Sequence, residues 1–188
     1  MTLPQSSINA GSYNQFPQLA DFSYNCISYL MNNNEDIWRM IYYPVPNAWD
    51  STANSNLTHA QKASLIYDGS EDSSLFNVFM DDGQPDVQTK ETTILKIYPM
   101  TAKGNNRVWG STTMCFDTYV HYKINTLSNY RMRMVYITQQ ILATLNGVNI
   151  GGLGKLNFDM MWDTSSKMSE SGVTPFKGMK LVMSTSIG

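Results

Sequence analysis

The chain has 188 residues, a net charge of −2 and only 15% charged side chains. A domain of this length buries roughly 70% of the surface that its unfolded chain exposes, so the core needs neither disulfides nor a metal. The thirteen Lys and Arg are spread along the chain without a dense basic run, which argues against general nucleic-acid binding.

The N-terminal stretch is polar and lacks the basic start and apolar run of a signal peptide. No window is apolar for long enough to predict a membrane span. Cys26 and Cys115 fit no C-x-x-C pattern, so we expect reduced thiols in a soluble intracellular protein. Residues 1–20 show no sustained period and predict an irregular arm, followed by a single domain over residues 21–188.

Apolar residues at helix-like spacing fill residues 22–41, with the asparagine run 32–34 as a possible interruption. Asn34 could cap a second segment, because two acidic residues follow it and favour the start of a helix. One kinked helix or two short helices satisfy this pattern. Pro44 and Pro46 then end the helical region.

A short helix is predicted at about 58–68, where Thr58 and Gln61 have the spacing of a capping box and Gly69 is the stop. The next segment mixes an apolar patch, Leu75 to Met80, with a turn-rich acidic tail. We interpret that segment as a long loop.

From residue 92 onward, apolar and polar residues alternate with a period of two. Residues 92–100 and 111–124 are predicted strands, joined as a hairpin by the Gly- and Asn-rich loop 101–107. In the second strand the even-numbered residues from Met114 to Ile124 are expected to face the core. The odd-numbered residues, from Cys115 to Lys123, are expected to form a polar face.

The longest helix is predicted at about 129–146, with Ser128 as its N-cap and Asn146-Gly147 as its C-terminal cap. Strands are predicted at 153–162 and 176–187, separated by a polar loop at 163–175. The expected fold is therefore α+β: N-terminal helices followed by a β-β-α-β-β antiparallel sheet with a helix packed on one face.

The glycine-rich stretch "LNGVNIGGLGKLNFD" superficially suggests a phosphate-binding loop. A P-loop needs a glycine where Asn149 stands and a hydroxyl where Leu156 stands. The stretch also follows a helix and precedes a strand, whereas a phosphate loop opens a helix. We expect the glycines to permit a tight connection, with phosphate or nucleotide binding through the Gly151–Lys155 turn as an alternative.

No catalytic or metal constellation emerges from the sequence. His59 and His121 have no ligand or carboxylate at metal spacing. Cys115 and His121 share a strand face, but six residues of extended chain place them about 20 Å apart, too far for proton transfer. The acidic residues between 71 and 86 match no calcium loop and predict a solvated segment. We therefore expect no enzyme, no cofactor and no metal.

Most of the Trp and Met residues are expected in the core. Trp49, in a Pro- and Asn-rich loop, and Trp109, beside a glycine, are the exceptions, because large rings on loops are the usual anchors of subunit contacts. Low charge with many Tyr and Met also suits broad subunit contacts.

Several stretches together resemble neck proteins of tailed bacteriophages, especially tail-completion or tail-terminator proteins. They are "YLMNNNEDIWRMIYYPVPNAWDSTANSNLTHAQKASLIYDG", "TILKIYPM", "DTYVHYKI", the "RMRM" helix that ends in "ILATLNG", and the turn "GGLGKL". The resemblance covers about residues 24–162.

The resemblance implies a structural virion protein whose α+β subunits form a ring, a hexamer or alternatively a dodecamer. The ring would terminate the tail tube or join it to the portal, with genome DNA passing through its lumen and no membrane partner. An adaptor or stopper ring of the same neck is the alternative. The expected location is the virion, with host cytoplasm during assembly. The candidate subunit contacts are Trp49, Trp109, Gly151, Gly152 and Gly154.

Overall fold

The structure is a computed structural model that describes residues 21–83, 90–104, 110–151, 154–164 and 175–187. The helices are α1 (Phe22–Asn33), α2 (Glu35–Tyr42), α3 (His59–Ala63) and α4 (Arg133–Leu145), with short 3-10 turns at Ser73–Leu75 and Tyr122–Ile124. The strands are β1 (Val78–Phe79), β2 (Thr93–Gly104), β3 (Gly110–His121), β4 (Asn157–Asp163) and β5 (Phe176–Ile187). This is the α+β class that the sequence predicts.

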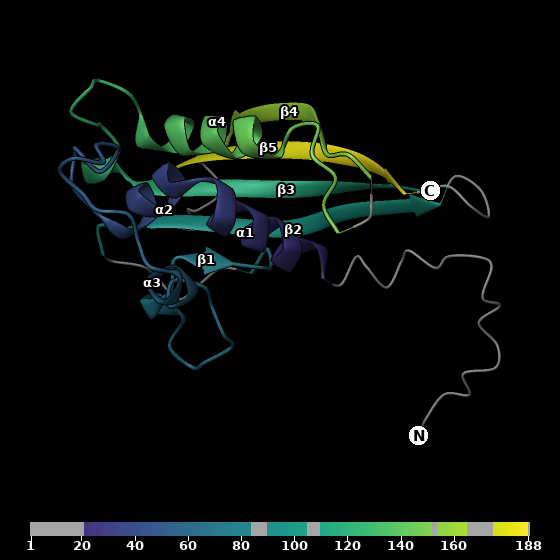
Figure 1. The fold of residues 1–188 in the computed structure, drawn as a ribbon, viewed down its shortest axis with the longest axis horizontal. Coiled ribbons are helices and arrows are strands. Elements are labelled where there is room, and N and C mark those ends of the chain that lie inside the picture. The colour runs from purple at the N-terminus through teal and green to yellow at the C-terminus, as the bar shows by residue number, and fades with distance from the viewer. Residues whose placement is uncertain (1–20, 84–89, 105–109, 152–153, 165–174, 188) are drawn as a thin grey trace.

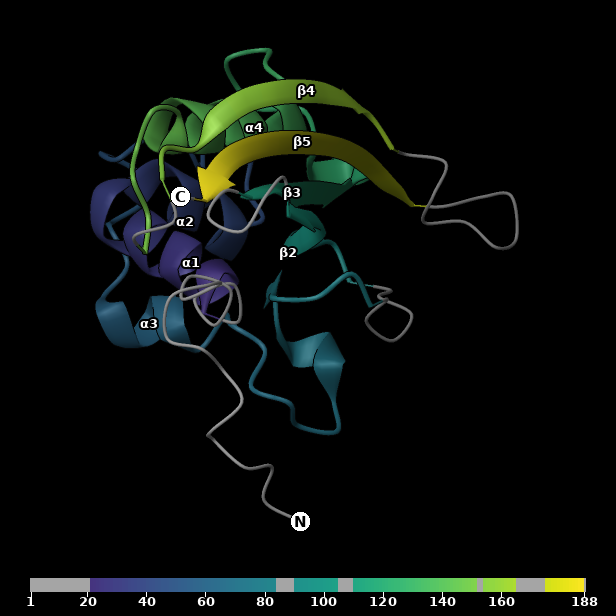
Figure 2. The same cartoon turned by 90° about the vertical axis from the view of Figure 1, so that its right-hand side faces the viewer.

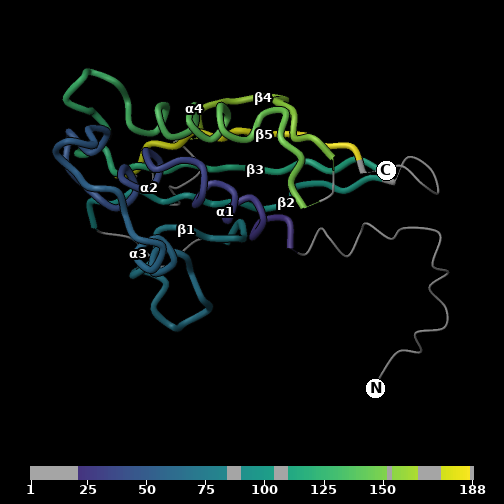
Figure 3. Tube along the Cα trace, in the orientation of Figure 1, coloured from purple at the N-terminus to yellow at the C-terminus, as the bar shows by residue number. Residues whose placement is uncertain are grey.

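The strands form one sheet in the order β1-β2-β3-β5-β4. The pairs β2·β3, β3·β5 and β4·β5 are antiparallel, while β1 pairs in parallel with β2. The last strand of the chain therefore lies inside the sheet, and β4 lies at one edge. The tube in Figure 3 shows β1 and β4 at opposite edges of the sheet.

Helices α1, α2 and α4 pack on the same face of the sheet, which we call the helix face (Figures 1 and 2). The main core joins apolar residues of these helices to Leu95 and Ile97 of β2, Phe116 of β3 and Leu181 of β5, all nearly inaccessible to solvent. Burying large apolar side chains contributes about 1.5–3 kcal/mol each, so this layer supplies most of the stability.

Asn34 separates α1 from α2 and confirms the predicted cap. Its extended backbone breaks the helix, and its side-chain oxygen accepts a hydrogen bond from the Ile37 amide. The same side chain donates to Gln140 and Thr144 of α4 at 3.1 and 2.8 Å. One residue therefore ends α1, begins α2 and fixes both against α4.

Arg133, at the start of α4, is completely buried and holds the end of α2. Its guanidinium donates to the carbonyl oxygens of Met40, at 2.8 Å, and Tyr43, at 2.7 Å, and also to that of Val45. Burial lowers the pKa of Arg133 to about 10. Because the last carbonyls of a helix have no partner within it, this contact satisfies groups that would otherwise be buried without hydrogen bonds.

Several predicted boundaries need correction. The region predicted as a loop between Leu75 and Met80 contains the short strand β1. Strand β2 continues to Gly104, through the start of the predicted loop 101–107. Helix α3 ends at Ala63 although its predicted capping box is present.

Helix α4 begins at Arg133 and not at 129. Ser128 does not cap it, because the Ser128 hydroxyl accepts a hydrogen bond from the Trp49 indole at 3.0 Å. The first amides are satisfied by Asn125 instead: its backbone carbonyl accepts from the Arg133 amide and its side-chain oxygen accepts from the Met134 amide. A cap eight or nine residues upstream is not visible in the local sequence pattern.

The polar face predicted for β3 exists, but it is not solvated. Every residue from Met114 to His121 is buried. We call this side of the sheet the outer face. At one end it carries a hydrophobic cluster of Phe79, Ile94, Tyr119 and Phe176, against which Tyr67 and Phe76 pack. The second cluster gives the sheet a small core on its outer side as well.

Candidate interaction surface

The two histidines lie in different surroundings, and neither belongs to a described metal cluster. His59 is exposed at the start of α3, while the buried His121 ring stacks on Tyr122 with ring centroids 4.9 Å apart. Within residues 21–83, 90–104, 110–151, 154–164 and 175–187, no group of three or more His, Cys, Asp or Glu residues could hold a metal ion. None of the described helices is long and apolar enough to cross a membrane.

The glycine turn lies between the C-terminal end of α4 and the start of β4, as predicted. A helix C-terminus carries the negative end of the dipole, so this geometry lends no support to phosphate binding. Gly151 and Gly154 both have positive φ, at 61° and 96°. A Cβ on Gly154 would lie 2.3 Å from the Ser186 backbone carbonyl oxygen, and one on Gly151 would lie 2.7 Å from the side-chain amide nitrogen of Asn25. Close packing against the backbone of β5 therefore explains Gly154, and the left-handed backbone conformation explains Gly151.

Of the other candidate contact residues, Trp109 and Gly152 lie outside the described residues. Trp49 is half-buried: its ring packs against the main core and its indole N–H donates to Ser128. Much of this ring is therefore engaged within its own chain. The role of these five residues in subunit contacts stays a prediction.

A buried charged cluster lies at the centre of the outer face. Lys180 Nζ lies 2.8 Å from Asp117 Oδ2, and both side chains are nearly inaccessible to solvent. The Tyr98 hydroxyl donates to the same Asp117 oxygen at 2.9 Å, and Lys180 also donates to Tyr98. Lys96 is buried beside them and donates to the Gly83 carbonyl oxygen.

The cluster contains two ammonium groups and one carboxylate. Burial lowers the pKa of Lys96, and the Asp117 carboxylate opposes that shift. Burial, followed by the negative charge of Asp117, raises the pKa of the Tyr98 hydroxyl. These shifts keep Tyr98 protonated as a donor. The cluster orders the outer face, and Lys96 connects it to the 80–83 segment.

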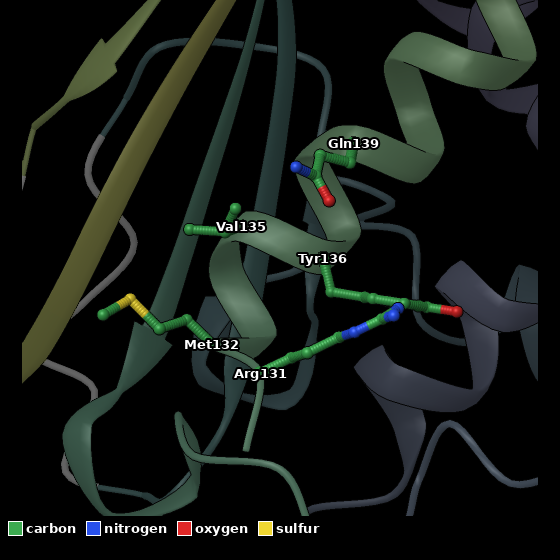
Figure 4. A pocket seen from close by; sticks show the side chains of 5 residues that line it. All are labelled: Arg131, Met132, Val135, Tyr136 and Gln139. Carbon is green, nitrogen blue, oxygen red and sulfur yellow. The ribbon is translucent and has the colours of Figure 1, made fainter. Parts of the chain in front are cut away.

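A shallow hollow of about 450 Å³ lies over the first turns of α4 and is lined by Arg131, Met132, Val135, Tyr136 and Gln139 (Figure 4). In Figure 4, Met132 and Val135 point toward the strands, while Arg131 and Tyr136 extend side by side toward α2. The Arg131 guanidinium lies 5.6 Å from the centroid of the Tyr136 ring. The polar side chains of Arg131 and Gln139 alternate with apolar and aromatic ones around the hollow, and its lining contains no His, Cys, Asp or Glu.

Tyr130, in the turn before α4, is 94% exposed and has a positive φ of 62°. Tyr residues rarely adopt this conformation, because their Cβ crowds the backbone. With the exposed Met132 beside it in sequence, Tyr130 places a ring at the surface near the hollow.

Strand β4 is the most unusual surface in the described part of the chain. All its residues except the half-buried Trp162 are exposed. Three of the exposed residues are large and apolar: Phe158, Met160 and Met161 are 47%, 49% and 37% accessible. The pairing shifts between Phe158 and Met160, which marks a bulge at Asp159. In the sequence, Leu156, Phe158, Met160 and Trp162 alternate with polar residues, the pattern of one side of an ordinary strand. The bulge divides that set between the two faces.

Sequence reasoning missed β4 as a candidate surface. Its alternation resembles that of a half-buried strand, and its edge position follows from the return of β5 between β3 and β4. The one local signal was the Met-Met pair within a short strand, because two adjacent apolar residues cannot both face one core.

The described residues define a small α+β protein with a three-helix layer on one sheet face, a second small core on the other face and an edge strand with exposed apolar side chains. The chain belongs to the YomW family, whose model matches residues 34–185. This name comes from a Bacillus phage region and indicates a phage-associated protein. A search of the curated proteins finds no match.

Proposed function

We propose that this protein is a structural component of the phage neck, a ring that terminates the tail tube or joins it to the portal. The observation that carries the proposal is β4, an edge strand on which Phe158, Met160 and Met161 stay 47%, 49% and 37% accessible in the described part of the subunit. Exposed apolar strand edges promote association, and proteins that remain monomers usually protect them.

Two further observations support an assembly role. The phage-type family name is consistent with a virion component. The low content of charged residues favours broad protein contacts over binding to a polyanion. Under this proposal the partners are further copies of the chain, the portal or its adaptors, and the tail-tube protein. The location is the virion, after assembly in the host cytoplasm.

In a ring of three or more subunits each subunit offers two different surfaces to its neighbours, and a hexamer matches the proposed role at the end of a tube. DNA would pass through the lumen without base-specific contacts. An adaptor or stopper ring of the same neck would need the same kind of assembly, so the two roles differ in position and not in subunit chemistry.

The position in the particle tests the proposal. Particles that carry an affinity-tagged copy of the protein are labelled with gold and imaged by electron microscopy, and we expect label at the head–tail junction. Label on capsid faces or at the distal tail tip, or no protein in purified particles, would contradict the proposal.

Deletion of the gene separates the two neck roles. Without a tail terminator, tube growth has no stop, and we expect overlong tubes unattached to heads. Without an adaptor or stopper, we expect tails of normal length and heads that lose their DNA. Complementation with the unchanged gene is the control.

A further inference from the structure

The open part of β4 is short and well defined. At the start of the strand, the Phe158 amide donates to the Asn146 side chain at 2.9 Å, which closes that end of the edge. Residues 159–163 follow, and in the described chain no strand pairs with them on the side away from β5. Met160 shares the outer face with Val182, and Met161 shares the helix face with Leu181.

Near the opposite edge of the sheet, strand β2 has a second stretch of matching length whose side away from β3 has no described strand beside it. Strand β1 pairs with β2 only at Leu95 and Lys96. Beyond that point, residues 99–103 of β2 are all exposed and have no described strand on the side away from β3. Met100 is 50% accessible, and its sulfur lies 3.6 Å from the Cys115 sulfur on the outer face.

The directions of the two strands are compatible with pairing. Three successive antiparallel pairings, β2·β3, β3·β5 and β5·β4, make β2 and β4 run in opposite directions. The strand pairings place Met161 level with Ile97, about four residues before the middle of the open stretch 99–103. A second copy related by an axis inclined to the strands is shifted along them by this amount and keeps its helix face on the same side. Its β2 edge would then meet β4 of the first copy as an antiparallel neighbour, the arrangement with the straightest hydrogen bonds.

The charges favour contact between different edges over contact between like edges. The open part of β4 carries two carboxylates, Asp159 and Asp163, and no cation, whereas the open part of β2 carries Lys103 and no carboxylate. Two β4 edges would bring carboxylates together in a low-dielectric contact, and two β2 edges would bring lysines together. A β4 edge against a β2 edge brings opposite charges together.

From these observations we propose that residues 159–163 of β4 pair with residues 99–103 of β2 in a second copy of this chain, extending one sheet across the subunit boundary. On the outer face, Met160 and Trp162 of one copy meet Met100 of the next. Each subunit then uses two different edges, so the contact repeats from copy to copy and forms a closed ring when the rotation between copies closes. This inference rests on the proposed function, because it names the surfaces that build the ring.

Two double variants of the full-length chain test the pairing. The first, Met160→Glu with Met161→Glu, blocks β4 and leaves β2 intact. The second, Met100→Glu with Lys103→Glu, blocks β2 and leaves β4 intact. Each should weaken association by about 100-fold, since each removes apolar contact and adds charge at a strand edge. All four side chains are exposed, so the subunit should still fold.

Mass photometry and sedimentation velocity then give the oligomeric state. The wild type is expected as a closed oligomer and each variant as a monomer. An equal mixture of the two variants is expected to form dimers only, because one intact β4 edge meets one intact β2 edge and both remaining edges are blocked. Dimers of the β2 variant alone would reveal contact between two β4 edges and overturn the proposal.

Other results also decide against the pairing. It is overturned if both variants keep the wild-type oligomer, if the β4 variant dimerises alone, or if the wild type is monomeric at every concentration. None of these results contradicts a location of the protein at the neck, which the gold labelling tests separately. Conversely, absence from particles would contradict the proposed function while the edge pairing is still measured in solution.

The control variant is Tyr24→Glu with Leu75→Glu. These side chains are 59% and 61% exposed, on α1 and on the 3-10 turn before β1, and belong to neither open edge. The control should keep the wild-type oligomer. Near-ultraviolet circular dichroism of all three double variants should match that of the wild type, which separates lost association from lost folding.

Discussion

At the scale of single residues, the buried charges of the outer face are the least expected feature of this sheet. A buried ion pair is costly to desolvate, and removing one partner leaves an uncompensated charge. Asp117 and Lys180 pair directly across neighbouring strands, and Tyr98 completes the hydrogen bonding of one carboxylate oxygen. The pair therefore fixes the register of β3 against β5.

We expect Lys180→Met to destabilise the subunit by about 3–5 kcal/mol, because it leaves the Asp117 carboxylate buried with weaker compensation. Asp117→Leu should cost a similar amount. The double variant should recover much of either loss, since two apolar side chains need no partner. Urea unfolding of the four proteins measures this cycle. Additive losses would show that the two residues act independently.

A second residue-scale prediction concerns His121. Burial lowers the pKa of His121 from the usual 6.5, and the Glu91 carboxylate opposes the shift. The unfolded chain therefore binds a proton more readily than the folded one. The contribution of His121 to stability is complete above about pH 6.5 and is lost as the pH falls toward its folded-state pKa.

The change to test is His121→Asn, which keeps an acceptor for the Lys123 amide. The free energy of unfolding should fall less steeply below pH 6.5 in this variant than in the wild type. His59→Asn is the matched control, because it removes a histidine at an exposed position. An unchanged slope in His121→Asn would refute the role of this group.

At the scale of elements, the residues at the ends of the helices hold the helices against one another. Helix α2 is held at both ends by residues that also contact α4 or belong to it: Asn34 at its start and Arg133 at its end. Breaking either contact disturbs two elements at once.

We expect Asn34→Ala to cost about 1–2 kcal/mol for the lost cap of α2, and more because the bonds to Gln140 and Thr144 disappear with it. Asn33→Ala is the matched control, since the Asn33 side chain is exposed and its hydrogen bond to the described residues stays within its own helix, at the Tyr29 carbonyl. Chemical unfolding curves of both variants compare the two. Equal small losses would exclude the proposed junction.

At the scale of the whole molecule, the core extends beyond the matched family region. The family model begins at residue 34, but α1 precedes it and contributes Phe22, Ile27 and Leu30, each at most 1% exposed. The helix layer is therefore incomplete without α1.

A chain that begins at residue 21 should unfold cooperatively at the wild-type temperature, because the buried residues of α1 are retained. A chain that begins at residue 34 should lose cooperative unfolding. Burial of each lost large apolar side chain is worth about 1.5–3 kcal/mol, and a domain has only about 5–15 kcal/mol in total. Scanning calorimetry measures both chains, and a cooperative transition of the shorter chain at the wild-type temperature would contradict this expectation.

The sequence by itself determined the features that depend on neighbouring residues. The cap at Asn34, the capping box at Thr58, the stop at Pro44 and the main strands of the sheet all follow from patterns within a few residues. These patterns act through local hydrogen bonds and side-chain periodicity, which need no knowledge of distant segments.

Only the tertiary structure decided the order of the strands, and with it the candidate surface. The return of β5 between β3 and β4 buries Lys180 against Asp117 and leaves β4 at an edge. The same order exposes Met160 and Met161, which in a central strand would be core. Strand order depends on contacts between residues far apart in the chain, and a period of two is the same at the centre and at the edge of a sheet.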